Sequence, residues 1–223
     1  MNNLLSRGLP SKRRQRQLSY FMEISLVGLL FVGLERGSVG IIVNAGMCLA
    51  VTQIPPILER DYELPMDPRL TLWITTAAFL HGVGVVGIPG LTDGNFYSGV
   101  PVVSEYWDHI THALSSSVVA AAGYATVRAV DEHSEDVYLP PKFIAVIILL
   151  FVLAFAVLWE LLEFGIGVAA TEFGTASVLT QYGVYDTLKD VVYNSIGAVI
   201  VALWGGVYLT DISDAIAERL GLA

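Results

Sequence analysis

Residues 143 to 170 read FIAVIILLFVLAFAVLWELLEFGIGVAA. The stretch is longer than the roughly 20 apolar residues that a helix needs to cross the hydrocarbon of a bilayer. Its only charged residues are Glu160 and Glu163, which stand three positions apart. It therefore predicts a membrane-spanning helix that carries two carboxylates on one face.

The rest of the chain shares this apolar character. Of 223 residues, 54% are hydrophobic and only 15% are charged, which is too few to cover the surface of a soluble domain of this length. The composition also excludes a disordered chain, a collagen-like repeat and a disulfide scaffold, and the single Cys48 has no partner for an internal disulfide. The sequence predicts an all-α integral membrane protein.

Six stretches are long and apolar enough to span a bilayer, and they predict a bundle of six transmembrane helices in one domain over residues 17–210. The predicted spans are 17–34, 37–58, 70–88, 107–128, 143–170 and 185–210. A basic arm, 1–16, precedes them and a short acidic tail, 211–223, follows. Pro55 and Pro56 are expected to end the second span. The loop 89–105 is rich in Gly and Pro and is expected to fold over the helix ends as a lid.

Basic residues predict the orientation of the bundle, because cytoplasmic flanks of membrane helices collect Arg and Lys. Five of the 12 basic residues lie within the first sixteen positions, and the loops 59–69 and 128–142 carry two each. Both termini are therefore predicted to be cytoplasmic, in a multi-pass protein of the plasma membrane.

The charge balance indicates the kind of environment in which the protein works. The net charge is -9, and lysine occurs only at positions 12, 142 and 189. An acidic surface with few lysines suits a salt-rich cytoplasm, where counterions screen the repulsion between carboxylates. We expect a halophilic source.

Polar residues recur at helical spacing in the last three predicted spans. Asp108 and His112 share one face, and Asp186, Asp190 and Asn194 form a stripe along another helix. Because successive spans alternate in direction, these groups and the Glu160–Glu163 pair reach one depth in the outer half of the bilayer. Carboxylates at that depth should face each other, water or a cation. The predicted catalytic residues are Asp108, His112, Glu160, Glu163, Asp186, Asp190 and Asn194.

Single members of this set can also be interpreted as residues with a purely structural role. Asp108 and Asp186 are also typical helix N-caps, and His109 points off the Asp108–His112 face and is expected at the membrane interface. His81 and Asn44 fall in the same outer half, where His81 alone is typical of helix packing. It is the joint pattern that favours a site.

Carboxylates combined with imidazole predict a site for one divalent cation, Mg²⁺, Mn²⁺ or Zn²⁺. The predicted metal ligands are Asp108, His112, Glu160, Glu163 and Asp190. A metal beside an acidic base activates water against an ester or a phosphate. The first functional hypothesis is therefore a metal-dependent hydrolase or transferase that acts on a lipid or lipid-linked substrate.

Two other classes stay open. A small proton- or cation-coupled transporter would use the same carboxylates, although only Glu23 and Gln53 are polar in the other half of the bilayer. A structural membrane protein would use them to fix helix packing.

The expected partners are membrane lipids and a lipid-linked small molecule, not nucleic acid, since the short basic arm lies beside a membrane span. The sequence does not predict the oligomeric state.

The spaced motifs Asp-His-x-x-His, Trp-Glu-x-x-Glu and Tyr-Asp-Thr-x-x-Asp-x-x-x-Asn-x-x-Gly-Ala, in this order, resemble the YjdF-type inner-membrane proteins and the wider VanZ-like group. The resemblance covers about residues 105–198. It implies a multi-pass membrane protein with these polar motifs in its helices, and it implies no established reaction. The matching positions are Asp108, His112, Trp159, Glu160, Glu163, Asp186, Thr187, Asp190, Asn194, Gly197 and Ala198.

Overall fold

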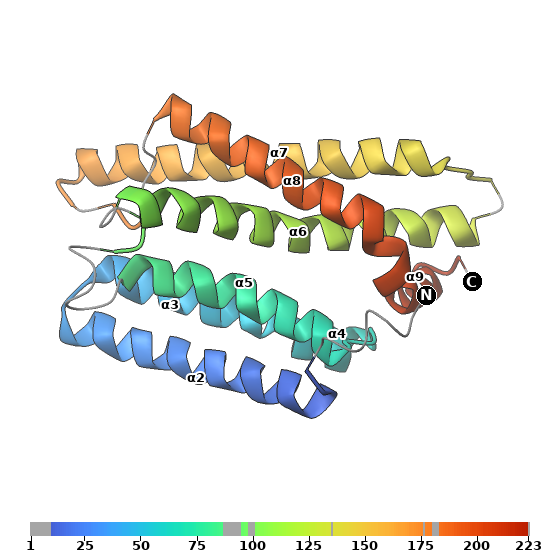
Figure 1. The fold of residues 1–223 in the computed structure, drawn as a ribbon, viewed down its shortest axis with the longest axis horizontal. Coiled ribbons are helices and arrows are strands. Elements are labelled where there is room, and N and C mark those ends of the chain that lie inside the picture. The colour runs from blue at the N-terminus through green and yellow to red at the C-terminus, as the bar shows by residue number, and fades with distance from the viewer. Residues whose placement is uncertain are drawn as a thin grey trace.

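A computed structural model describes residues 10–86, 95–97, 101–134, 136–175, 177–179 and 183–222, and every regular element in these ranges is a helix (Figure 1). Six helical stretches are long and apolar enough to cross a membrane, with α3 and α4 forming one of them together, so the predicted all-α membrane fold is confirmed. The helices are α2 (Lys12–Glu35), α3 (Val39–Thr52), α4 (Ile54–Tyr62), α5 (Pro68–Val86), α6 (Pro101–His133), α7 (Pro141–Glu172), α8 (Val184–Tyr208) and α9 (Thr210–Arg219).

The first helix begins earlier than its apolar part. The hydroxyl of Ser11 accepts a hydrogen bond from the backbone N–H of Arg14, which caps α2 at Lys12, so the last five residues of the predicted basic arm are helical. The helix ends before Gly37, whose φ of 60° is a left-handed conformation that glycine adopts without strain. Ser38 then caps α3 in the same way as Ser11 caps α2.

The second span is broken rather than ended by its prolines. Helix α3 stops at Thr52, before the prolines, and Pro55 and Pro56 lie in the first turn of α4. A proline in the first helical turn removes an N–H that has no intrahelical partner, so it starts a helix without loss. The expectation that these prolines end the span is therefore wrong: they begin a short second helix that continues to Tyr62.

The fourth span is longer than predicted at both ends. Helix α6 includes residues 101–105, which the sequence assigned to the lid, and it continues through the acidic residues Asp131 and Glu132. Arg128 pairs with both of these carboxylates, one turn apart on the same face. The parts of the predicted lid at 89–94 and 98–100 lie outside the described residues.

The helices pack as two groups of three. Helices α2, α3 and α5 pack against one another, α6 packs against α7 and α8, and α5 joins the groups by packing against α6 (Figure 1). The main core lies in the second group, where Ala120, Ile148, Val152 and Ala198 are buried. The start of α2 and the end of α9 lie at the same end of the bundle, and the end of α7 and the start of α8 lie at the other.

Ion pairs link segments at the end that holds the start of α2 and the end of α9. Arg219 of α9 pairs with Glu63 at 2.6 Å, and Lys12 of α2 pairs with Asp67 at 3.1 Å. Most of the predicted acidic tail forms a helix, α9, which packs against α6 and α8. All four of these side chains are well exposed, so each pair contributes at most about 1 kcal/mol.

Candidate functional site

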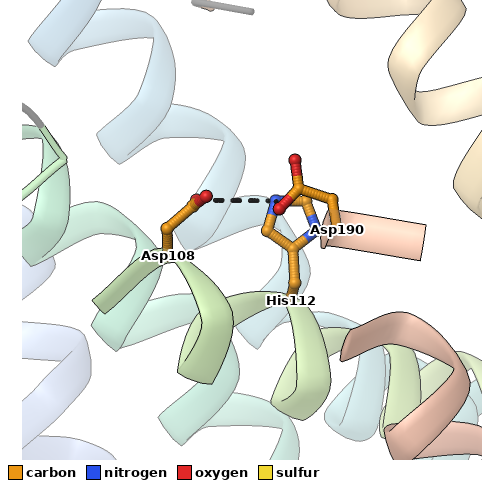
Figure 2. A group of neighbouring side chains, drawn as sticks. All are labelled: Asp108, His112 and Asp190. Carbon is orange, nitrogen blue, oxygen red and sulfur yellow. Dashed lines mark ion pairs between the residues drawn. The ribbon is translucent and has the colours of Figure 1, made fainter. Parts of the chain in front are cut away.

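Three of the predicted ligands form one compact group. Asp108 and His112 lie one turn apart on α6, and Asp190 reaches them from α8 (Figure 2). Nε2 of His112 is 3.5 Å from Oδ1 of Asp108 and 3.6 Å from Oδ1 of Asp190. One ligand atom from each residue lies within 4.8 Å of the other two, which is close enough for one cation to bind all three.

A glycine allows the two helices of this group to approach closely. A Cβ atom on Gly197 of α8 would collide with the hydroxyl of Ser116 and the carbonyl of Ala113 on α6, and it would lie 2.9 Å from the backbone nitrogen of Ser117. Small residues at such contacts let membrane helices pack backbone against backbone. Gly197 stands two turns after Asp190, so this contact holds Asp190 near His112.

Asp190 is the member of the group that most needs a partner. Its side chain is almost fully buried, with 3% of the residue exposed. Its Oδ1 accepts no hydrogen bond from any residue that the structure describes. A carboxylate in this setting lacks the water that would stabilise its charge, and a bound cation would replace that stabilisation.

The two glutamates of α7 are placed differently. Glu163 accepts a hydrogen bond of 2.9 Å from the indole N–H of Trp159. Glu160 is buried and accepts one of 2.7 Å from the hydroxyl of Thr187. Neither belongs to the compact three-residue group, so the structure does not bring all five predicted metal ligands together.

A cavity of about 600 Å³ lies between the two helix groups. Asp108, His112 and Asp190 line it, and so do three further predicted site residues: Glu163, Asp186 and Asn194. No Lys or Arg is among the described lining residues. The volume lies within the range of ligand pockets, which is roughly 300–1,000 Å³.

A hydrogen-bonded network on the opposite wall joins Asn44, His81 and Tyr97. The Nδ2 of Asn44 donates to the carbonyls of Gly40 and Val178, so its Oδ1 faces Nε2 of His81 at 3.1 Å. Nε2 must then carry the proton, and Nδ1 of a neutral ring accepts from the hydroxyl of Tyr97 at 3.1 Å. Burial raises the pKa of Tyr97, which keeps this hydroxyl protonated.

The network fixes two connecting segments over this end of the cavity. Asn44 holds Val178, and the N–H of Phe96 donates to the carbonyl of Gly84 at 2.8 Å. A Cβ atom on Gly84 would lie 2.5 Å from both Trp107 and Tyr97, so only glycine leaves room for them. Asn95, Tyr97, Val178 and Leu179 all line the cavity.

We expect Asn44→Ala to destabilise the protein by about 1–3 kcal/mol, because the buried N–H of His81 loses its acceptor and the carbonyl of Val178 loses its donor. Thermal unfolding in detergent measures the change. Ser25→Ala is the control, because the Ser25 hydroxyl is exposed and bonds only the carbonyl of Phe21 in its own helix. Equal midpoints for Asn44→Ala and wild type would contradict the network.

The structure shows the surroundings of two further histidines, His109 and His81. His109 is buried, and its ring stacks on Tyr193 with centroids 3.9 Å apart, because α8 covers that side of α6. Both ring nitrogens of His81 have hydrogen-bond partners, Asn44 and Tyr97, as its interpretation as a packing histidine implies. Tyr97 was not among the residues predicted from the sequence. The only feature that could have indicated it is that an aromatic residue stands within a loop rich in Gly and Pro.

Comparison with known proteins identifies the family to which the chain belongs. A family model described as "Predicted membrane protein (DUF2238)" matches residues 18–211, which is most of the chain. No curated protein and no solved structure matches. The match agrees with the membrane class and carries no reaction with it.

Proposed function

The chain belongs to the DUF2238 family of predicted membrane proteins, and for this member we propose a metal-dependent hydrolase or transferase that acts on a lipid or lipid-linked substrate within the membrane. One observation carries the proposal: Asp108, His112 and Asp190 converge on the wall of a cavity that is otherwise largely apolar. The finer kinship with the YjdF-type and VanZ-like proteins is part of this proposal, and the spaced motifs that contain these three residues support it.

The donor set suits a divalent cation. Two carboxylates and one imidazole provide three ligands, which leaves positions for water and substrate, as catalytic metal sites require. A bound metal would polarise the scissile group and lower the pKa of bound water. Glu163 and Asp186 line the same cavity and are candidates for a general base.

The charge of the cavity strengthens the need for a metal. Four carboxylates line it and no described Lys or Arg does, so a phosphate would be repelled unless a cation stood between. The lining gives no support to the transporter hypothesis, because neither Glu23 nor Gln53 belongs to it. From the basic residues we also infer that the end with the termini faces the cytoplasm, so that Asp108 lies toward the outer side.

Lipid turnover tests the function. The protein is reconstituted in vesicles made from lipids of its host membrane, and the lipids are followed by mass spectrometry with added Mn²⁺, Mg²⁺ or Zn²⁺, or with a chelator. We expect metal-dependent loss of one lipid class that stops in His112→Ala. The matched control is His133→Ala, since His133 lies at the other end of α6 and outside the cavity. Turnover that is equal in both variants, or absent with every metal, would overturn the proposal.

A further inference from the structure

The cavity has an apolar floor on four of the five spans that line it. On each of four spans, the lining residue farthest from the polar end is apolar: Ile54, Ile74, Val119 and Val152. Counted along α6, Val119 lies about 16 Å below Asp108, and along α7, Val152 lies about 16 Å below Glu163, at 1.5 Å per residue. Half of a hydrocarbon core about 30 Å thick has the same depth, so the cavity is as deep as one leaflet.

The two walls of the cavity differ in chemistry. The wall made by α6 and α8 is polar over most of its length and includes Thr111, Ser115 and Asn194 below the Asp108 level. The facing wall, made by α3, α5 and α7, is mainly apolar below Asn44 and His81. A ligand that fills this space must have a polar head and a long apolar part.

One side of the cavity faces the bilayer. Both α3 and α7 line it, yet α3 packs against α2 and α5, whereas α7 packs against α6 and α8. Several apolar lining residues on this side are largely exposed, including Leu158 at 60%, Leu162 at 49% and Phe155 at 48%. At the polar end, by contrast, the segments that hold Tyr97 and Val178 lie over the cavity.

We propose that a single hydrocarbon chain of a membrane lipid enters sideways between α3 and α7 and rests on the floor formed by Ile54, Ile74, Val119 and Val152. The chain end is then buried at the level of the bilayer centre, and the head lies beside Asp108, His112 and Asp190. This names the substrate class of the proposed function as a bilayer lipid, and it rests on that function only for the reaction at the head. The floor limits the length of chain that fits.

Photolabelling measures whether a chain reaches the floor. The protein is reconstituted in phosphatidylcholine vesicles that contain a phosphatidylcholine with a diazirine near the end of one acyl chain, and labelled residues are mapped by mass spectrometry. Val152 and Ile148 are both buried on one face of α7, at 1% and 0% exposure, but only Val152 lines the cavity. We expect label on Val152 and none on Ile148. Label confined to lipid-facing residues would overturn the proposal.

Two substitutions on α7 form a matched pair. Ala156 is buried and lines the cavity, whereas Ala154 is exposed and does not. Ala156→Phe should abolish labelling of Val152, and Ala154→Phe should leave it intact. If Ala156→Phe does not fold, Ala77→Leu fills the cavity from the α5 wall and should have the same effect. Undiminished labelling in a folded, filled variant would overturn the proposal.

The result is separable from the fate of the metal hypothesis. Labelling of Val152 should persist with a chelator present and in His112→Ala, because an apolar chain needs no metal for its burial. Loss of metal binding with labelling retained would remove the reaction and keep the lipid site. Loss of labelling in a protein that still binds metal would remove the lipid site alone.

Discussion

Asp190→Asn is expected to lower the affinity for Mn²⁺ or Zn²⁺ by about 100-fold or more, since it removes a charged ligand, and loss of even an outer-shell partner costs about 10–100-fold. Asp190 is the most deeply buried of the three grouped residues, and asparagine keeps its shape while removing its charge. Metal content after purification and calorimetric titration measure the loss. Asp211→Asn is the control, because Asp211 is exposed on α9.

The same variant should show a crossover in stability. With a chelator present, Asp190→Asn should unfold at a higher temperature than wild type, because it removes a buried carboxyl group that lies beside the carboxyl group of Asp108. With metal at 100 times the wild-type Kd, wild type gains about 2.7 kcal/mol and a variant that binds 100-fold more weakly gains about 0.4 kcal/mol, so the order should reverse. Two curves that keep the same order with and without metal would show that Asp190 holds no cation.

Gly197→Ala should be the most damaging single-methyl change in the bundle. The added carbon would meet Ser116 and two backbone atoms of α6, so α6 and α8 must move apart. Overpacking of this kind costs about 1–3 kcal/mol or more. Because Asp190 lies on the displaced helix, metal affinity should fall as well, although the added methyl group does not itself contact the metal site. Thermal unfolding and metal titration are measured on the same sample.

Gly167→Ala on α7 is the matched control. No atom lies within 4 Å of the Cβ position there, and alanine favours a helix over glycine by about 0.5–1 kcal/mol. This variant should therefore be as stable as wild type or more stable. If the two alanine variants had the same midpoint and the same metal affinity, the contact between α6 and α8 would not determine the position of Asp190.

Much of the architecture could be read from the sequence, because each span is a long apolar run and each polar face repeats at helical spacing. Asp108, His112 and Asp190 were predicted for the same reason. Which of the acidic residues lie close enough to bind one cation could not be predicted, because this depends on how α7 is rotated against its neighbours. Glu160 and Glu163 stand on one face, yet they contact Thr187 and Trp159. The break at Gln53 was also missed, because prolines end one helix and begin another with equal ease.

The pairing of α6 with α8 has a consequence for biogenesis. These two spans are less apolar than α7, which separates them in the chain, and their polar residues include those of the site. During synthesis α6 must enter the membrane before α8 exists, with Asp108 and His112 still without Asp190. Stable insertion of α6 should therefore wait for α8. A chain truncated after α7 would leave α6 poorly retained in the bilayer, although every residue of α6 is intact.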